Sequence, residues 1–277
     1  PLLINDPGLI TNWSFNSGSG DILYDHSGNQ NHGTINGATW EEIISGCTDP
    51  YAENYNENAS VDDGSCAGYP DNGEYSLSFD GGDDYVNLGS QTSYDLGLDD
   101  FSLTAFIKPS TNSQNGRVIC RGITSNQGSY QLNIDLNGKL RLSFNNLDFY
   151  SEEGIIQSNQ WQQIAMIRNG ETIKGYVDGI IVINENSPIL DLTNQEPLVL
   201  GIEPGYGSNF NGEIDEVSIW SKALSQEELL TSASNLSISE HHLIGFWKMN
   251  IGSGDILYDH SGNQNHGTIN GATWSTD

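Results

Sequence analysis

Alternating apolar and polar residues dominate this chain and predict short β-strands with one buried face each. The alternation is clearest in YSLSFD, FSLTAFI, YQLNIDL, LRLSF and WQQIAMI, at residues 75–80, 101–107, 130–136, 140–144 and 161–167. The segments TIKGYV, IIVIN, PLVLGI and EIDEVSIW continue the pattern. So many short strands predict an all-β fold, an antiparallel β-sandwich.

Residues typical of hairpin turns and of a helix cap lie between and after these strands. The dipeptides Asn137-Gly138, Asn169-Gly170 and Asp178-Gly179 favour type I′ hairpin turns, because such residues accept a positive φ. One short helix is predicted where Ser225 and Glu228 form a capping-box pattern around the run QEELLTSA.

The chain also contains a long internal repeat. Residues 18–40 recur without a change at residues 252–274, which indicates tandem duplication. We therefore expect a linker at 1–8, a full domain at 9–234, a linker at 235–242 and the truncated start of a second copy at 243–277. A repeated module favours avidity or scaffolding over catalysis in solution.

Three cysteines bear on the compartment and on the fold. Cys47 and Cys66 enclose a polar loop within an insertion at residues 41–68, and we expect them to form a disulfide. Closing a loop of about 20 residues stabilises a fold by roughly 3 kcal/mol. A disulfide indicates an oxidising compartment. Cys120 lies in an apolar strand and is expected to be a small buried hydrophobe.

The net charge narrows the range of partners. The chain has 9 Lys and Arg against 37 Asp and Glu, a formal charge of −28, which disfavours nucleic acid and anionic membranes. No apolar run approaches the roughly 18 residues that a membrane span needs, so no membrane insertion is expected. An acidic surface suits multivalent cations and a salty exterior, although simple solubility explains the charge equally well.

Three segments resemble a known family. They are W-x-F-N-x-G-S-G with the following Y-D-x-S-G-N-x-N-x-G-T-I-N-G-A-T-W, then SFDGGDDYVNLG at 78–89, then FNGEIDEVSIWSKALSQEEL at 210–229. Together they resemble the laminin-G-like domains of the concanavalin A-like lectin and glucanase superfamily. The resemblance implies a jelly roll of two antiparallel sheets over residues 9–230. The segment from Cys47 to Cys66 resembles an element of secreted and surface proteins of marine and Bacteroidetes-type bacteria.

The same resemblance implies a calcium site. In this family the Asp of the I-D-E-V signature lies near the early D-x-S-G-x-x-N loop, and the matching residues are Asp25, Gly28, Asn31 and Asp215. Side-chain and backbone oxygens of this kind suit a structural Ca²⁺ that joins the ends of the domain. The alternative is that Asp25 and Asn31 cap a glycine-rich turn through side-chain-to-backbone hydrogen bonds.

A catalytic site is not expected. Jelly-roll glucanases carry E-x-D-x-x-E on one strand, so that two carboxylates face the cleft. Glu213 and Asp215 match this pattern, but Ser218 stands where the second Glu belongs, and Glu216 falls on the other face of a regular strand. The chain is therefore expected not to be an enzyme.

Other polar and aromatic groups receive structural interpretations. Asp80, Asp83 and Asp84 predict a tight turn between two strands. The loop from Asn54 to Asp63 has the alternating oxygen ligands of calcium loops but lacks the Gly and the terminal Glu of an EF-hand, so any ion there would be held weakly. The histidines 26 and 32, repeated at 260 and 266, lack a third ligand and predict no metal site. The tryptophans 13, 161 and 220 fall on alternating strands and are expected in the core.

These features predict a secreted, non-catalytic binding or adhesion module of a repetitive cell-surface protein, stabilised by Ca²⁺. The expected ligand is a cell-surface glycan or protein, or neighbouring repeats of the same protein. One alternative is a carbohydrate-binding module of a polysaccharide-degrading enzyme. Another is a self-assembling repeat, in which residues 243–274 complete a neighbouring subunit.

Overall fold

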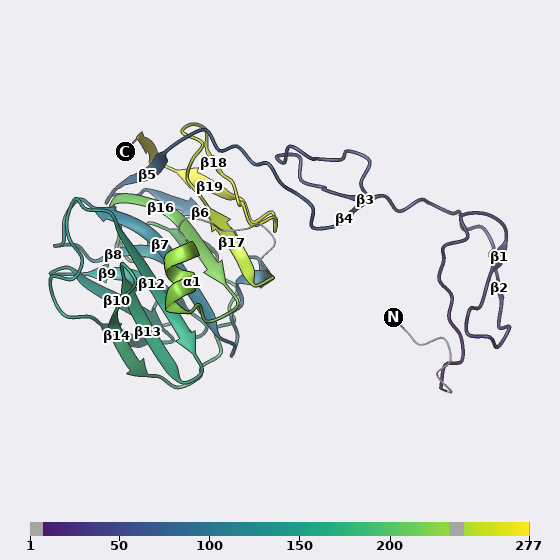
Figure 1. Ribbon diagram of the computed structural model, residues 1–277, viewed down its shortest axis with the longest axis horizontal. Coiled ribbons are helices and arrows are strands. Elements are labelled where there is room, and N and C mark those ends of the chain that lie inside the picture. The colour runs from purple at the N-terminus through teal and green to yellow at the C-terminus, as the bar shows by residue number, and fades with distance from the viewer. Residues whose placement is uncertain (1–7, 233–240, 277) are drawn as a thin grey trace.

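Alternation of side chains places one face of each long strand in a shared core. In β10 (Lys139–Phe144), Leu140, Leu142 and Phe144 are fully buried, and Arg141 and Ser143 point to the opposite face. Two large sheets pack these apolar faces against each other (Figure 1). The computed structural model describes residues 8–232 and 241–276 of the chain.

The first sheet has the strand order β11-β10-β9-β8-β15-β6-β19-β18, and every neighbouring pair in it is antiparallel. Its remaining strands are β6 (Tyr85–Asn87), β8 (Gly116–Arg121), β9 (Tyr130–Asp135), β11 (Leu147–Tyr150), β15 (Leu198–Leu200), β18 (Ile256–Leu257) and β19 (Gly267–Asn270).

The second sheet has the order β14-β13-β12-β7-β16-β5-β20, with β17 paired to the far half of β16. Its strands are β5 (Tyr75–Asp80), β7 (Phe101–Pro109), β12 (Gln162–Asn169), β13 (Thr172–Val177), β14 (Ile180–Asn186), β16 (Asn211–Trp220), β17 (Leu243–Trp247) and β20 (Thr273–Thr276). The all-β sandwich predicted from the alternation is thereby confirmed.

Two of the three predicted glycine turns have the expected backbone. Asn137 and Gly138, and likewise Asp178 and Gly179, all have positive φ. The third turn differs: Asn169 pairs with Thr172, so the turn residues are Gly170 and Glu171, and only Gly170 has a positive φ. The two-residue turn of this hairpin therefore begins one residue later along the chain than the sequence predicted.

The helix α1 (Gln226–Ser232) begins with the predicted capping box. The backbone N–H of Glu228 donates to Ser225 Oγ at 3.2 Å, and the backbone N–H of Ser225 donates to Glu228 Oε2 at 2.7 Å. Leu229 of the helix packs with Trp220 and Phe246 on the outer face of the second sheet (Figure 1). A single turn of 3₁₀ helix, η1 (Thr92–Tyr94), precedes β7. Among the described residues, no helix is both long and apolar enough to cross a bilayer.

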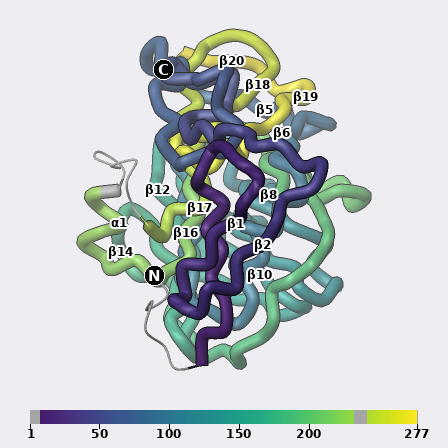
Figure 2. Tube along the Cα trace, turned by 90° about the vertical axis from the view of Figure 1, so that its right-hand side faces the viewer, coloured from purple at the N-terminus to yellow at the C-terminus, as the bar shows by residue number. Residues whose placement is uncertain are grey.

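The last described segment of the chain completes both sheets. We call residues 243–276 the closing segment and residues 75–232 the body. In the closing segment β17 pairs with β16, β19 with β6, and β20 with β5. Figure 2 shows β18, β19 and β20 grouped with β5 and β6 at one end of the sandwich. The division expected from the sequence, with a domain at 9–234 and a second copy at 243–277, separates strands that are hydrogen-bonded together. Most of the expected linker, 235–242, lies outside the described residues.

The first copy of the repeated sequence makes no such pairing. Residues 9–40, the N-terminal copy, form only the two-stranded ladder of β1 (Ile22–Leu23) and β2 (Gly33–Thr34), together with a bridge between Trp13 and Asp25. Figure 1 shows this segment apart from the body. Trp13 is therefore 42% exposed, and its prediction as a core residue is wrong. Trp220 is buried as predicted.

A small disulfide-linked unit lies between the N-terminal copy and the body. We call residues 44–69 the Cys-clasped module; it holds the short parallel pair β3 (Ser45–Gly46) and β4 (Val61–Asp62). The predicted disulfide between Cys47 and Cys66 is confirmed. Cys120 is a free, fully buried thiol, as predicted.

β16 is interrupted where β17 joins it. The register of β16 against β7 shifts between Asp215 and Ser218, and Glu216 has a φ of 44°. Burial raises the pKa of Glu216 to about 7, and Glu74 adds to this, while Lys248 of the closing segment acts in the opposite direction. This carboxyl group thus changes charge near neutral pH at the junction of body and closing segment.

We predict that the closing segment contributes strongly to the stability of the body. Leu257→Ala removes a fully buried side chain and should cost about 2–5 kcal/mol of unfolding free energy. The matched control is Leu23→Ala, the same residue in the same sequence context, which should cost under ~1 kcal/mol because the N-terminal copy contacts no sheet of the body. Urea denaturation at low protein concentration measures both; equal losses would contradict the role of the closing segment.

We also predict a pH dependence from Glu216. Because its pKa is raised in the folded state, the folded protein holds this proton more tightly, and stability falls as pH rises from about 4.5, the ordinary value, to about 7. Glu216→Gln should abolish this component, so its stability relative to the wild type should grow between pH 4.5 and 7 and then level off. Urea midpoints across pH 4–8 test this, with exposed Glu152→Gln as control. A constant difference between Glu216→Gln and wild type would disprove the burial effect.

Candidate functional site

The first sheet carries a row of polar side chains on the face opposite the core. On β9 and β10, Leu132 and Leu142 enter the core, so their neighbours Asn133 and Arg141 project from the other face. The strand register places Arg141 between Asn133 and Tyr150. We call this surface the polar face; its residues are Gln131, Asn133, Asp135, Arg141, Ser143, Asp148 and Tyr150.

Arg141 lies at the centre of the accessible part of this face. Its guanidinium is 3.0 Å from Asp148 and 3.6 Å from Asp135, and it stacks over the ring of Tyr150 with 5.6 Å to the centroid. The Tyr150 side chain is 48% exposed. Partial burial raises the pKa of Tyr150, so its phenol remains a hydrogen-bond donor at neutral pH. An aromatic ring, a cation and two carboxylates are thus presented together.

The inner part of the face is a buried ion-pair network. Arg117 is 2.6 Å from Glu203, and Gln131 Nε2 donates to Glu203 Oε1 at 3.1 Å. Burial raises the pKa of Glu203, but hydrogen bonds from Thr124 and Gln131 and the Arg117 charge outweigh it and hold that pKa below its usual range. The fully buried Asn133 Oδ1 has no hydrogen-bond partner among the described residues. This network fixes the positions of the side chains beside Arg141.

The Asp25 loop of the sequence-predicted calcium set is held by its own hydrogen bonds. Asp25 Oδ1 accepts the backbone N–H groups of Asn12 and Ser27 at 2.9 Å each. Asp25 Oδ2 accepts the Ser27 hydroxyl at 2.8 Å and the Asn31 backbone N–H at 3.0 Å. Burial raises the pKa of Asp25, but these hydrogen bonds dominate and hold it well below its usual range. Asn31 Nδ2 donates to the Ile10 carbonyl at 3.0 Å, and Gly28 turns the loop with a φ of 89°.

Asp215 does not join this loop. It lies in β16 of the body, whereas the loop from Asp25 to Asn31 connects β1 and β2, which Figure 1 shows apart from β16. The structure thus brings together Asp25, Gly28 and Asn31 and leaves Asp215 elsewhere. The contacts of Asp25 agree with the turn-capping alternative.

A second acidic group lies in the turn between β5 and β6, as the sequence predicted for the segment FDGGDDY. Within the described ranges, Asp80, Asp83 and Asp84 are the group of three carboxylates whose oxygens all lie within 4.8 Å of one another. Burial raises the pKa of Asp84, and the negative charges of Asp80 and Asp83 add to this, although the Asp80 backbone N–H donates to Asp84 Oδ2 at 2.8 Å. A cation would relieve this repulsion.

The residues considered for glycoside hydrolysis have structural partners. Glu213 accepts the Ser76 hydroxyl at 3.0 Å and pairs with Lys108 at 3.2 Å. At the position of the missing second Glu, the buried Ser218 Oγ is 2.6 Å from Thr104 Oγ1 and accepts the Trp220 indole N–H at 2.8 Å. Glu216 lies in the bulge. No second carboxylate therefore faces Glu213 at that position.

Sequence reasoning missed a role for the repeated histidines. His266 Nδ1 accepts the backbone N–H of Asp259 at 2.9 Å, so its Nε2 carries the hydrogen and donates to Asp49 Oδ2 at 2.6 Å. Tyr51 and Tyr69 of the Cys-clasped module pack edge-on against the same imidazole. The module thus docks on the closing segment. The only signal in the sequence was the exact recurrence of this histidine.

Comparison with known proteins agrees with this architecture. Comparison with curated proteins gives no match. Among solved structures, a Bacteroides ovatus protein described as carbohydrate-binding matches with a TM-score of 0.62 and 18% identity, over 75% of this chain and 61% of that one. The chain thus spans less than two thirds of that protein. The native heptameric SAP-like pentraxin of Limulus polyphemus matches with a TM-score of 0.53 and 16% identity, over 74% and 95% of the two chains. At these identities the likeness shows the fold.

The family assignment comes from the sequence. Residues 80–230, more than half of the chain, match the Laminin_G_3 family model, described as the concanavalin A-like lectin/glucanases superfamily. Two of the three segments that carried the resemblance, at 78–89 and 210–229, overlap the matched residues, and the two-sheet sandwich agrees with this match. The chain belongs to the concanavalin A-like lectin and glucanase superfamily, as a laminin-G-like domain.

Proposed function

We propose that this protein is a non-catalytic, extracellular glycan-binding module of a repetitive cell-surface protein, acting in adhesion. The observation that carries the proposal is the arrangement around Arg141, where an exposed tyrosine ring, a guanidinium and two carboxylates share one rigid sheet surface. A sugar ring offers an apolar face to an aromatic side chain and hydroxyl groups to charged hydrogen-bonding partners. The described neighbour from Bacteroides ovatus supports the same ligand class.

The net negative charge of the protein disfavours anionic glycans. The formal charge of −28 repels sulfated and carboxylated polymers as it repels nucleic acid. Arg141 and Arg117 are each already paired with carboxylates, so neither leaves an uncompensated positive charge for an anionic sugar. The proposed ligand is therefore a neutral glycan.

We propose no catalysis because β16, the strand that would carry the two catalytic carboxylates, does not present such a pair. Glu213 is held by Ser76 and Lys108, and Ser218 occupies the position of the second acid. Retaining hydrolysis needs two carboxyl groups about 5–5.5 Å apart. The extracellular setting is supported by the Cys47–Cys66 disulfide, which is stable under oxidising conditions.

A structural Ca²⁺ is part of the proposal, and the turn of Asp80, Asp83 and Asp84 is its better-supported location. There three carboxylates converge and repel one another, while the oxygens of Asp25 are engaged with four donors of their own loop. Hard carboxylate oxygens are the ligands that Ca²⁺ prefers. The ion would stabilise the β5–β6 turn beside the closing segment and would take no part in chemistry.

The glycan proposal predicts that Tyr150→Ala and Arg141→Ala each weaken binding to neutral polysaccharides at least about tenfold, or about 1.4 kcal/mol. The matched control is Tyr55→Ala, an equally exposed tyrosine in the Cys-clasped module, which should bind as the wild type does. A glycan array followed by calorimetry on the full chain measures this. Binding that is lost equally in all three variants, or absent from the wild type, would contradict the proposed face.

The calcium proposal predicts a higher melting temperature in millimolar Ca²⁺ than in chelator. At a free ion concentration of 100 times Kd the gain is about 2.7 kcal/mol. Asp83→Asn should abolish this shift in melting temperature, because it replaces a negatively charged ligand by a neutral amide. Asp25→Asn should leave the shift unchanged. Loss of the shift in Asp25→Asn alone would instead support the set predicted from the sequence. No shift in the wild type would exclude a stabilising calcium ion.

A further inference from the structure

The N-terminal copy has the same internal architecture as the closing segment. Trp13 Nε1 donates to the Asn31 carbonyl at 2.9 Å, and Trp247 Nε1 donates to the Asn265 carbonyl at 2.9 Å. The buried carboxylate Asp259 accepts four hydrogen bonds, from the same positions that supply Asp25. The N-terminal copy is therefore shaped in advance, although it contacts no sheet of the body.

The two copies differ in what covers them. Trp247 is fully buried in the core of the body, whereas Trp13 is 42% exposed. Met249 is 1% exposed, and its counterpart Phe15 is 67% exposed. Tyr24, Ile22 and Ile10 are further large apolar residues of the N-terminal copy that face water. Their counterparts Tyr258, Ile256 and Ile244 in the closing segment are less exposed, so the N-terminal copy lacks the cover that the closing segment has.

Glycine positions show the shape that this surface fits. A Cβ on Gly252 would lie 2.5 Å from the Tyr75 ring, and one on Gly271 would lie 2.2 Å from Asp84 Oδ1, so the body packs directly on these two glycines. A Cβ on the counterpart Gly18 or Gly37 would meet no atom within 4 Å beyond its neighbours along the chain. All four glycines have positive φ, and in the N-terminal copy the space that the body fills in the closing segment is open.

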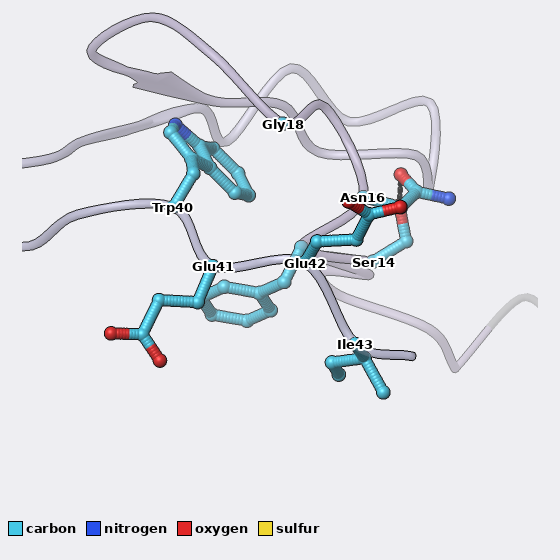
Figure 3. A pocket seen from close by; sticks show the side chains of 8 residues that line it. Ser14, Asn16, Gly18, Trp40, Glu41, Glu42 and Ile43 are labelled. Carbon is cyan, nitrogen blue, oxygen red and sulfur yellow. Dashed lines mark hydrogen bonds between the residues drawn. The ribbon is translucent and has the colours of Figure 1, made fainter. Parts of the chain in front are cut away.

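A hollow lies on the N-terminal copy, on the side that corresponds to the body-facing side of the closing segment. It has a volume of about 730 Å³ and is lined by Ser14, Phe15, Asn16, Gly18, Trp40, Glu41, Glu42 and Ile43. In Figure 3, Trp40 lies on one side of it, and Ser14 and Asn16, joined by a hydrogen bond of 2.8 Å, lie on the other. In the closing segment the position of Gly18 is Gly252, against which the Tyr75 ring packs. The hollow therefore corresponds to the place of an aromatic side chain of the body.

A second surface of the N-terminal copy is also uncovered. Tyr258 and His266 of the closing segment, with ring centroids 5.6 Å apart, contact the Cys-clasped module through Tyr51 and Asp49. Tyr24 and His32 keep the same 5.6 Å edge-on arrangement, and both are exposed. A matching partner must therefore present both a Cys-clasped module and a body.

We propose that the N-terminal copy, residues 9–40, is a second closing segment, whose partner is the body and Cys-clasped module of a second copy of this chain. In its own chain that place is filled by residues 243–276. Strands of one molecule then complete the sheets of the next, which links copies head to tail by β-strand pairing. This linkage is independent of glycan binding.

Differences between the copies explain why the chain's own segment occupies its body first. Phe246 packs with Trp220 and Leu229, and its counterpart in the N-terminal copy is Asn12. Replacing a buried aromatic side chain by an amide costs packing and leaves a polar group to satisfy. Ser17 likewise stands at the position of Ile251. The N-terminal copy is thus the weaker of two competing segments.

The test uses a cross-link that forms only in the proposed register. Thr268 is the Cα partner of Asn87 on β6, and its counterpart is Thr34; all three are exposed. Cα partners on antiparallel strands lie about 4.5–5.5 Å apart, within the range of about 4.4–6.8 Å that a disulfide spans. In the full chain, Asn87→Cys with Thr268→Cys provides the positive control, and Asn87→Cys with Thr34→Cys probes the proposal.

Displacement of the chain's own segment should produce the cross-link. Adding Trp247→Ala to the Asn87→Cys/Thr34→Cys chain should raise disulfide-linked dimers and higher species at least about tenfold on oxidation at high concentration. A further Trp13→Ala should abolish them. If Trp247→Ala does not fold, the exchange Asn12→Phe with Phe246→Asn makes the N-terminal copy the stronger segment and should give the same ladder. Cross-linking within single chains would overturn the second copy as partner, and no cross-link would overturn the complementarity.

Discussion

A buried carboxylate with four donors holds the closing segment in shape. Asp259 accepts the backbone N–H groups of Phe246, Ser261 and Asn265 and the hydroxyl of Ser261, and so ties β17 to the loop that follows β18. Each carboxylate oxygen accepts two of these hydrogen bonds, so both oxygens have partners within the segment. The fixed loop then presents β17, β19 and β20 to three different strands of the body. Both sheets of the sandwich depend on this element for their last strands.

The first sheet carries the polar face at one edge and the closing segment at the other. In the order β11-β10-β9-β8-β15-β6-β19-β18, the polar face around Arg141 lies on β9 to β11, and the closing segment lies at the opposite end. A ligand on the polar face therefore does not compete with the strand pairing that completes the sandwich. A linked row of copies would keep every polar face available, and several weak glycan contacts would add up to strong adhesion.

The alternation along single strands and the capping box of Ser225 and Glu228 were predictable because they are local. The sequence predicted a core position for Trp13 from its place on an apolar segment, but only the packed body, which covers Trp247 and not Trp13, separates a buried indole from an exposed one. The position of Asp215 relative to the Asp25 loop depended on the same packing: Asp215 lies in β16 of the body, whereas Asp25, Gly28 and Asn31 lie in the N-terminal copy. The polar face needed the pairing of β9, β10 and β11 before its residues could be seen together.

The N-terminal copy and the closing segment compete for one body, and over residues 9–40 and 243–274 their sequences differ only before residues 18 and 252. The chain's own closing segment is connected to the body through residues 233–242, which sets a high effective concentration, and it carries Phe246 where the other copy carries Asn12. Both effects favour closure within one chain, so a free chain presents its N-terminal copy to solvent while its own sheets are complete. An exchange between chains then needs either the loss of Phe246 packing or a second body without its own segment. The substitution at position 12 thus sets how readily copies link, while the unchanged residues 18–40 preserve the ability to do so.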